Sequence, residues 1–434
     1  MSVRVRFAPA PTGQVHIGNI RAAIFNWLYA RHEGGKYLLR IEDTDRERST
    51  PEAVQTLMDS LQWLGLEPDE PPLYQSTRTS AHLEAAELLL KKGAAYEEDK
   101  GATGQGKCVV FKMPGTAMAY HDLIKGDLRK EAADMSDFVI VRSNGSPVFH
   151  LANVVDDIHM NITHVIRGDD HVENTYRHLA MFQALGSPVP AYAHLPMIVN
   201  SQGKPYSKRD GAAFVGDFKS KGFRAEAFFN YLMLLGWSPG DDKEKIDRHE
   251  AAKLFTLERI KNGPAQMDMK KLSFLNGRYI TELPPDVFVG VIRQFIGGYK
   301  WAGLMGEVYF VKVCALMQSR TVLFADAERW KYFFTDYYDL DEAAAEKHLK
   351  KNDPKKALSI LCENLAKAEF NAAEIEKTIR ASEAAAGMAE GKLNQPTRVA
   401  VTGLQIGVGL YETIEMLGKD RVLLRLDRTI AGLA

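Results

Sequence analysis

One cluster of residues near the N-terminus has the composition of a phosphate-binding turn. It spans residues 9–19, PAPTGQVHIGN, and follows an alternating, β-branched stretch that predicts a strand over residues 3–8. A helical pattern begins at its end, and a helix N-terminus offers unpaired N–H groups and a positive dipole to a phosphate. Gly18 would let a ring or a phosphate approach the backbone, and His16 could donate to charge that develops on an α-phosphate. A His16 that merely caps the helix is an equal alternative.

A second cluster is compact and basic. Residues 203–211, GKPYSKRDG, place three cations between glycines, which fits a mobile clamp on a polyphosphate. Ser207 and Lys208 lie at its centre. A solvated basic loop is the alternative for this stretch taken alone.

Two further polar clusters lie at the ends of predicted strands. Residues 40–48, RIEDTDRER, follow one apolar stretch, and residues 165–171, VIRGDDH, follow another. For the first, a salt-bridged surface is the alternative. The second ends in two aspartates and a histidine, a set that could hold a metal, but no other partner with ligand spacing accompanies it.

The elements that must position these clusters begin with a βαβ unit. A strand over 3–8, a helix from residue 19 to the pair Gly34-Gly35, and a strand over 37–41 follow one another directly. This order predicts an open α/β class with ligands at the carboxyl ends of the strands. Helices are also expected over 51–64, 80–92 and 228–237, strands over 107–112 and 137–142, strands returning to the first sheet over 149–155 and 164–166, and an almost wholly helical region from 284 onward.

Composition restricts the class of protein. The chain has 434 residues, 45% of them apolar and 26% charged, which predicts several globular domains and excludes disorder as the main state. Lys+Arg 55 against Asp+Glu 56 gives a net charge of -1, which excludes a protein that coats nucleic acid through bulk charge. Three widely spaced cysteines fit a reduced, cytoplasmic compartment. No targeting or membrane segment is expected, because the longest strongly apolar run is about half the length that a bilayer requires.

Together and in this order, the clusters resemble those of the bacterial-type glutamyl-tRNA synthetases, a family of class I aminoacyl-tRNA synthetases. His16 to Asn19 (HIGN) is similar to the HIGH signature and follows the family's RFAPxPTG, here residues 6–13. Residues 39–46, LRIEDTDR, resemble another family motif, and residues 205–209, PYSKR, resemble the KMSKS-type loop. Further similar blocks lie at 150–157, 163–171, 274–277 and 395–400, so the resemblance covers nearly the whole chain.

The resemblance implies a two-step ligase. ATP and L-glutamate would give a bound glutamyl-adenylate and pyrophosphate, and the glutamyl group would then pass to tRNA(Glu) with release of AMP. His16 and Lys208 are the implied catalytic residues. The implied ATP-binding residues are His16, Gly18, Asn19, Asp170, Ser207 and Lys208. The implied glutamate-binding residues are Arg6, Ala8, Ala10, Glu42, Phe149, Asn153 and Arg167.

The residue types agree with this placement. A guanidinium fork pairs both oxygens of a side-chain carboxylate, and Arg6 and Arg167 on strands would hold that geometry stiffly. Glu42 would receive the α-amino group. A buried arginine would also reject neutral glutamine, since its charge would be left unpaired. Mg²⁺ is expected to accompany ATP through phosphates and water, without a dedicated carboxylate cage.

Several positions depart from the family pattern. Pro205 stands where a first lysine is common, so clamping would rest on the remaining cations of the loop. Ala10 replaces a common serine and Phe149 a common tyrosine, and either change removes a hydroxyl that could contact the substrate. Residues 96–111 form a shorter segment than in typical relatives and keep only Cys108 of a cysteine cluster that binds zinc in some of them. No zinc is therefore expected.

The resemblance also implies which parts of the chain form which domains. The implied parts are a Rossmann-like α/β nucleotide-binding catalytic domain in two halves (1–85 and 149–202), an α+β insertion for the acceptor end (86–148), a KMSKS-type loop with a helical stem-contact domain (203–282) and an all-α anticodon-binding domain (283–434). The available cations of the last part, each expected on a solvated helix face, are Arg320, Arg380, Arg398 and Arg421. A monomer without membrane partners is expected.

Three alternatives stay open. A non-discriminating enzyme would charge tRNA(Gln) as well as tRNA(Glu) and would feed an amidation pathway. An inactive tRNA-binding paralog would explain the changes at Ala10, Phe149 and Pro205. An enzyme that glutamylates a modified tRNA base would usually lack the anticodon-binding region that this chain keeps.

Overall fold

The computed structural model describes residues 2–45, 48–99, 106–240, 242–351 and 353–433. Arg46 and Glu47 of the charged cluster and residues 100–105 of the shortened segment lie outside the described residues. The chain forms two compact units. The first comprises Met1–Ser220 and Ala225–Leu275, and the second comprises Lys221–Arg224 and Asn276–Ala434. The finer, five-part division stays a prediction.

The first unit begins with the predicted βαβ unit. β1 (Arg4–Phe7) leads into α1 (Ile17–His32), and β2 (Lys36–Ile41) pairs with β1 in parallel. The turn back into β2 requires a glycine, because a Cβ on Gly35 would lie 2.3 Å from the carbonyl oxygen of Val3. The prediction is confirmed, and the loop after β1 leaves the sheet at its carboxyl end.

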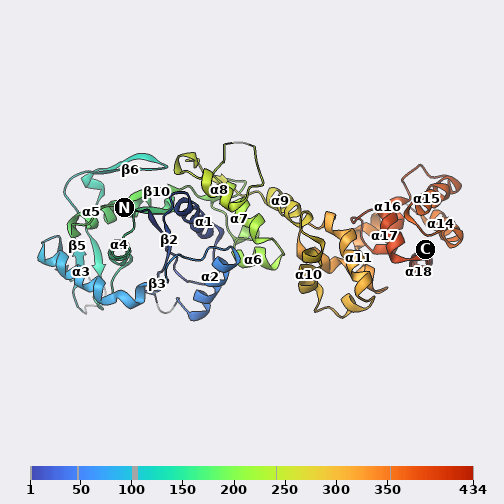
Figure 1. Ribbon diagram of the computed structural model, residues 1–434, viewed down its shortest axis with the longest axis horizontal. Helices are drawn as coiled ribbons and strands as arrows, with labels where there is room; N and C mark the ends of the chain where they lie inside the picture. The colour runs from blue at the N-terminus through green and yellow to red at the C-terminus, as the bar shows by residue number, and fades with distance from the viewer. Residues whose placement is uncertain (1, 46–47, 100–105, 241, 352, 434) are drawn as a thin grey trace. The chain divides into compact units, whose positions relative to one another are not determined.

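A central sheet organises the first unit (Figure 1). Its other strands are β3 (Leu73–Tyr74), β6 (Met118–Asp122), β7 (Gly126–Lys130), β9 (His164–Gly168) and β10 (Ala191–Leu195). Within the described residues the strand order is β3-β2-β1-β9-β10-β6-β7, and every pair is parallel except the β6–β7 hairpin. α1 packs against β1, β2 and β9. The predicted α/β class is confirmed, as is the strand expected over 164–166.

The strand predicted over 149–155 is wrong, because these residues begin a helix. α4 (Phe149–His159) buries Leu151 and Val154 against α3 (Thr79–Lys91) and α5 (Val172–Leu185). A short apolar run does not distinguish a buried strand from a buried helix, and here the i, i+3 spacing of the apolar residues continues beyond the run.

The other helices and strands predicted for the first unit are confirmed, with their ends within one or two residues of the expected positions. The exception is the helix expected over 228–237, which begins and ends about three residues earlier. A small antiparallel sheet among the described residues has the order β4-β5-β8, with β4 (Ala95–Glu98), β5 (Cys108–Phe111) and β8 (Phe138–Val141). The remaining elements are α2 (Pro51–Trp63), α6 (Val215–Ser220), α7 (Ala225–Leu234), α8 (Arg248–Leu254), β11 (Ile198–Val199) and β12 (Ala265–Gln266). The boundary between the units falls within α9 (Met269–Thr281).

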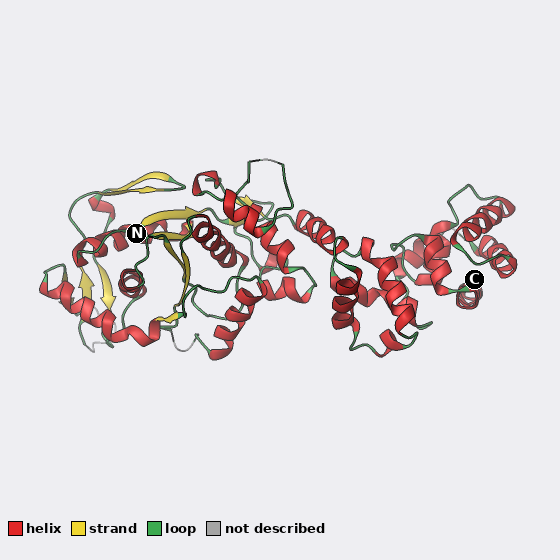
Figure 2. Cartoon of the chain, in the orientation of Figure 1, coloured by secondary structure: helices red, strands yellow, loops and turns green. Residues whose placement is uncertain are grey.

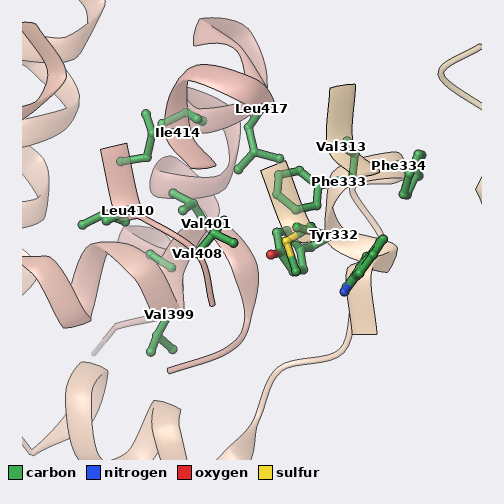
Figure 3. Close-up of a cluster of buried hydrophobic side chains, with 14 of the residues drawn as sticks. Val313, Tyr332, Phe333, Phe334, Val399, Val401, Val408, Leu410, Ile414 and Leu417 are labelled. Atoms are coloured by element: carbon green, nitrogen blue, oxygen red, sulfur yellow. The ribbon is translucent and has the colours of Figure 1, made fainter. Parts of the chain in front are cut away.

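The second unit is helical, and all strands that the structure describes belong to the first (Figure 2). Its helices are α10 (Pro285–Ile296), α11 (Glu307–Met317), α12 (Lys331–Phe334), α13 (Glu342–Ala345), α14 (Lys355–Lys367), α15 (Ala372–Ala386), α16 (Asn394–Thr402), α17 (Leu410–Leu417) and α18 (Lys419–Gly432). Buried side chains such as Val313, Phe333, Val401 and Ile414 form its core (Figure 3). The helical prediction is confirmed. Every helix in the described ranges is too short or too polar to cross a bilayer.

Some arginines of the second unit contradict the expectation of solvated faces. Arg421 donates from Nε to Asp336 Oδ1 at 3.1 Å, and Arg380 forms an ion pair with Glu383, which is almost fully buried. Arg398 is half-buried, and burial lowers its pKa. The pattern along one helix shows which residues share a face, but it does not show which neighbouring helix covers that face.

Candidate active site

A cavity of about 580 Å³ lies where the parallel strands of the central sheet end. Its wall includes residues 8–10 after β1, Glu42 after β2 and residues 168–171 at the end of β9. This is the edge at which open α/β sheets bind ligands. The predicted site residues on the wall are Arg6, Ala8, Ala10, His16, Gly18, Asn19, Glu42, Phe149, Asn153, Arg167 and Asp170. Ser207 and Lys208 do not line it, but they directly follow the lining residue Tyr206.

The helix α4 supplies one wall of this cavity. Residues four positions apart share a face of a helix, so Phe149, Asn153 and Asp157 project in similar directions. Phe149 and Asn153 line the cavity, and Asp157 is buried next to it beside Arg6. A strand would have turned successive residues to opposite faces. The corrected secondary structure therefore explains why these residues meet.

Asp157 balances two buried arginines. Arg6 donates from Nε to Asp157 Oδ1 at 3.0 Å, and Arg40 forms an ion pair with the same oxygen. Burial alone would raise the pKa of Asp157, but Arg40 and Arg6 hold it below its ordinary value. The sequence interpretation missed both Arg40 and Asp157 as parts of the site. The available signal was a charged residue inside an apolar stretch, which must be paired when buried.

Glu42 and Asn153 form an acceptor-rich corner of the cavity. Asn153 donates from Nδ2 to Glu42 Oε1 at 3.0 Å, and Arg40 donates to the same oxygen at 3.2 Å. Asn153 Oδ1 is buried and accepts no hydrogen bond from the described residues. Burial raises the pKa of Glu42, although Arg40 and Arg6 oppose the change. An orphaned amide oxygen beside a carboxylate suits a cationic donor such as an ammonium group.

Two buried arginines on the wall of this cavity have no carboxylate partner among the described residues: Arg21, which donates to the carbonyls of Leu235 and Pro196, and Arg167. Arg167 is the one that lies beside Phe149 and the groups at the ends of the strands. Its side chain is only 8% exposed. Within the described ranges its hydrogen-bond partners are His194, Thr175, His178 and the backbone carbonyl of His171, and no carboxylate is among them. Burial lowers its pKa to about 10, so the group still carries its charge at neutral pH. The site therefore attracts an anion.

Histidines surround Arg167 and Phe149. His178 Nδ1 lies 3.4 Å from Arg167 Nη1, and its Nε2 lies 3.2 Å from His150 Nδ1. Burial lowers the pKa of His178 well below its ordinary value, and burial followed by the nearby arginines lowers that of His150 to about 4. Both are neutral at pH 7, so they add no charge that would compete with Arg167.

His16 is the N-cap of α1. Its Nδ1 accepts a hydrogen bond from the Gly18 amide at 3.1 Å, and its Nε2 donates to the Tyr206 carbonyl at 3.1 Å. Burial lowers the pKa of His16, which fits this neutral tautomer. The capping interpretation is therefore correct for this state of the protein. Donation to a phosphate requires that Nε2–H leave the Tyr206 carbonyl.

The basic loop folds into a short 3₁₀ turn, Lys208–Asp210. Ser207 caps it, with its hydroxyl 3.0 Å from Asp210 Oδ2. Lys208 and Arg209 are exposed. This arrangement leaves the two cations available to a charged ligand, whereas the Ser207 hydroxyl is already engaged.

The acidic pair after β9 has partners other than a metal. Asp169 Oδ2 accepts from Lys125 Nζ at 2.9 Å, and Asp170 lies exposed with His171 Nε2 at 3.6 Å. Across the part of the chain that the structure describes, no group of three histidine, cysteine or acidic residues is arranged to hold a metal ion.

Two known families match successive parts of this chain. Residues 2–102 and 97–274 match the family described as tRNA synthetases class I (E and Q), catalytic domain. Residues 290–430 match the anticodon binding domain family.

Similar proteins align with almost the whole chain. Glutamate–tRNA ligase 2 of Thermoanaerobacter pseudethanolicus is 36% identical over 468 residues, which cover 99% of this chain and 98% of that protein. Glutamate–tRNA ligase of Methylacidiphilum infernorum is 38% identical over 454 residues, with coverage of 99% and 98%. The chain belongs to the glutamate–tRNA ligase family.

A solved structure supports the same assignment. The crystal structure of a glutamate tRNA ligase from Elizabethkingia meningosepticum in complex with its amino acid has a TM-score of 0.83 and 28% identity, and each chain is covered over 100% of its length. The resemblance inferred from the motifs is confirmed. In this glutamate–tRNA ligase family member, the departures at Ala10, Phe149 and Pro205 all lie on the wall of the cavity.

Proposed function

We propose that this member of the glutamate–tRNA ligase family joins L-glutamate to tRNA(Glu) and holds the amino acid between Arg167 and Glu42. One observation carries the proposal. Arg167, whose charge no described carboxylate balances, lines the same cavity as the Glu42 carboxylate and the orphaned Oδ1 of Asn153. A ligand with a carboxylate at one end and an ammonium group at the other satisfies all three groups.

The side-chain carboxylate of glutamate would pair with Arg167, and its ammonium group would donate to Glu42 and Asn153 Oδ1. The reacting α-carboxylate would then point toward the N-terminus of α1. Arg6 would attract the ligand through its charge and would not form a direct ion pair with it. Its guanidinium already donates to both carboxylate oxygens of Asp157. Glutamine would be rejected, because its neutral amide leaves the buried guanidinium of Arg167 unpaired.

ATP would lie over the N-terminus of α1, near Gly18, Asn19 and Asp170. A glutamate carboxylate oxygen attacks the α-phosphorus, and the bond to pyrophosphate breaks. Lys208 would neutralise the departing pyrophosphate, and His16 would donate to the α-phosphate after it leaves Tyr206. The terminal ribose hydroxyl of the tRNA then attacks the acyl carbon, and AMP leaves. Mg²⁺ would enter with ATP, bound by phosphates and water.

The remaining expectations rest on the family. The second unit would bind the anticodon, stacking unpaired bases on aromatic or arginine side chains. We expect a monomer that works in the cytoplasm and contains no zinc. Ser207 would contribute to ATP binding only after its hydroxyl leaves Asp210.

Aminoacylation of purified tRNA(Glu) and tRNA(Gln) with labelled glutamate and Mg-ATP tests the proposal. Charging of tRNA(Glu) alone is the expected result and establishes a discriminating enzyme. Charging of both tRNAs would show the non-discriminating form, which requires a partner amidotransferase. Charging of neither, with tRNA still bound, would contradict the proposal in favour of an inactive paralog.

Lys208→Ala separates the catalytic form from an inactive paralog by a second route. Loss of one group that stabilises transition-state charge should slow adenylate formation by about 10²–10³. ATP–pyrophosphate exchange in the presence of tRNA measures this step, and Lys221→Ala, a lysine outside the loop, is a matched control. Exchange at the wild-type rate in Lys208→Ala would remove Lys208 from the mechanism.

A further inference from the structure

The β6–β7 hairpin belongs to the predicted insertion, yet it is part of the central sheet (Figure 1). β6 pairs in parallel with β10, where Asp122 lies opposite Tyr192. Asp122 is fully buried at the end of β6, and His194 is fully buried on β10. A buried carboxylate in a segment expected to contact tRNA requires a partner inside the first unit.

That partner is His194, which connects Asp122 to Arg167. Asp122 Oδ2 lies 2.6 Å from His194 Nδ1, and His194 Nε2 lies 3.2 Å from Arg167 Nε. A carboxylate only accepts, so the proton of the neutral imidazole is on Nδ1. His194 Nε2 is then an acceptor, and Arg167 Nε–H donates to it. The carboxylate thus selects the imidazole tautomer that can hold the arginine.

The same guanidinium is held on a second side. Arg167 Nη2 donates to Thr175 Oγ1 at 2.8 Å and to the His171 carbonyl at 3.2 Å. The hairpin also reaches the cavity through Lys125, whose Nζ lies 2.9 Å from the lining residue Asp169. The orientation of the planar fork is therefore determined by contacts behind it, which lowers the entropy cost of binding a carboxylate.

We propose that Asp122 and His194 are positioning residues, which fix the Arg167 guanidinium for the carboxylate of the amino-acid substrate and make the β6–β7 hairpin a part of the glutamate site. The inference rests on the proposed function for the identity of the ligand of Arg167. Neither residue touches the substrate in this arrangement. Their effect is transmitted through the hydrogen bond at Arg167 Nε.

Asp122→Asn tests the proposal directly, because backbone N–H groups determine the orientation of the side-chain amide that the substitution introduces. Asp122 Oδ1 accepts from the amides of Ile124 at 3.0 Å, Lys125 at 2.9 Å and His194 at 3.2 Å. An asparagine must keep its oxygen at these three donors, so its NH₂ group would face His194 Nδ1. The imidazole would then carry its proton on Nε2, which lies 3.1 Å from Thr175 Oγ1, and it could no longer accept the hydrogen bond from Arg167 Nε–H. Loss of the correct tautomer disables a histidine even though its geometry is intact.

The experiment measures steady-state aminoacylation by the full-length protein with tRNA(Glu), varying glutamate and ATP separately. Asp122→Asn should raise the KM for glutamate by about 10- to 100-fold, the range for residues that orient a metal-ligating side chain through a hydrogen bond, with the KM for ATP near the wild-type value. Asp127→Asn, on the exposed part of the same hairpin, is the matched control and should change neither. Thermal unfolding of each variant reports separately on folding.

His194 variants provide rescue and cover a failure of Asp122→Asn to fold. His194→Gln offers Arg167 an amide oxygen, which accepts a hydrogen bond whatever the protonation of the neighbouring side chain. The glutamate KM of this variant should therefore lie between those of wild type and Asp122→Asn. In the His194→Gln background, Asp122→Asn should add little, since the tautomer no longer matters. His194→Asn is too short to reach Arg167 and should raise the glutamate KM as Asp122→Asn does.

Two results would overturn the inference. One is an unchanged glutamate KM in soluble Asp122→Asn, and the other is an equal rise in the KM for ATP, which would indicate a general structural role. Arg167→Ala distinguishes these from a failure of the proposed function. If Arg167→Ala raises the glutamate KM and Asp122→Asn does not, the positioning inference alone is wrong. If wild type charges no tRNA, the proposed activity is wrong. If Arg167→Ala leaves the glutamate KM unchanged, the proposed glutamate site is wrong.

Discussion

Arg167 in the first unit and Arg425 in the second are both buried, yet their charges are balanced in different ways. Arg425 is 1% exposed and donates to Asp336 Oδ1 at 2.8 Å and to the Tyr332 carbonyl at 2.8 Å. Arg167 is 8% exposed and donates to neutral groups alone among the described residues. The second unit thus supplies a carboxylate to Arg425, whereas the described residues of the first unit supply none to Arg167.

This difference separates an arginine that stabilises the fold from one that binds a ligand. Leaving a buried charge without a counter-ion costs several kcal/mol, so a fold retains such a charge where another molecule supplies the counter-ion. Arg6 and Arg40 lie beside the same cavity, but Asp157 balances them as Asp336 balances Arg425. Burial by itself therefore does not identify the ligand-binding arginine. The missing carboxylate distinguishes Arg167 from these two, and Arg21, which also lacks one among the described residues, already donates to the carbonyls of Leu235 and Pro196.

Arg167→Ala has the largest expected effect on the binding side of the comparison. Removing one member of a buried charge pair costs about 2–5 kcal/mol, so the KM for glutamate should rise about 100-fold. The KM for ATP should stay near wild type, and the free energy of unfolding should fall less than in Arg425→Leu, because the loss of Arg167 removes hydrogen bonds to neutral groups but breaks no internal ion pair. Steady-state kinetics and urea unfolding measure the two. An unchanged glutamate KM would transfer the carboxylate contact to another residue.

Arg425→Leu tests the stabilising side. Breaking a buried ion pair by removing one partner should lower the free energy of unfolding by about 3 kcal/mol, with no change in the KM for glutamate. Arg428→Leu, an exposed position on the same helix α18, is the control and should cost much less. Urea unfolding followed by circular dichroism measures the loss. Equal effects of the two variants would show that the Arg425–Asp336 pair contributes nothing beyond a surface contact.

Acidification should affect the two units differently. Burial lowers the pKa of His150 to about 4 and that of His178 well below its ordinary value, so the unfolded chain takes up these protons near pH 6.5, before the folded chain does. The stabilisation is complete above about pH 6.5 and is lost as pH falls toward the folded pKa values. The second unit contains one histidine, His348. Hydrogen exchange corrected for intrinsic rates should show weaker protection of α4 and α5 at pH 5.5 than at pH 7.5, with little change in α14 and α18. Equal losses in both units would contradict the prediction.

Phe149→Tyr has the smallest expected effect and sharpens the description of the cavity. A hydroxyl added on the wall would make one hydrogen bond with the bound amino acid, worth about 1 kcal/mol, and should lower the KM for glutamate about fivefold. Phe138→Tyr, outside the lining residues of the cavity, is the control. A higher glutamate KM would show that the ring of Phe149 fills space that the hydroxyl cannot share.

Much of the fold was predictable because its signals are local. The strand, glycine turn and helix around residues 3–41 follow from side-chain periodicity and glycine placement, and the helical region after 284 follows from the 3.6-residue period. The assignment of Phe149–Val155 to a strand failed because a short apolar run suits either element. The i, i+3 spacing beyond the run favours the helix, and the packing of α4 between α3 and α5, which involves segments far apart in the sequence, stabilises it.

The sequence by itself determined the family, the βαβ frame and part of the set of residues that line the cavity, because motifs and periodicity depend on neighbours along the chain. The tertiary structure alone decided which of the predicted arginines has a carboxylate partner and which does not. Asp157 meets Arg6 across 151 residues, and Asp122 meets His194 across 72. Such partners are chosen by strand order and burial, and burial is what gives an ion pair or an imidazole tautomer its energetic weight.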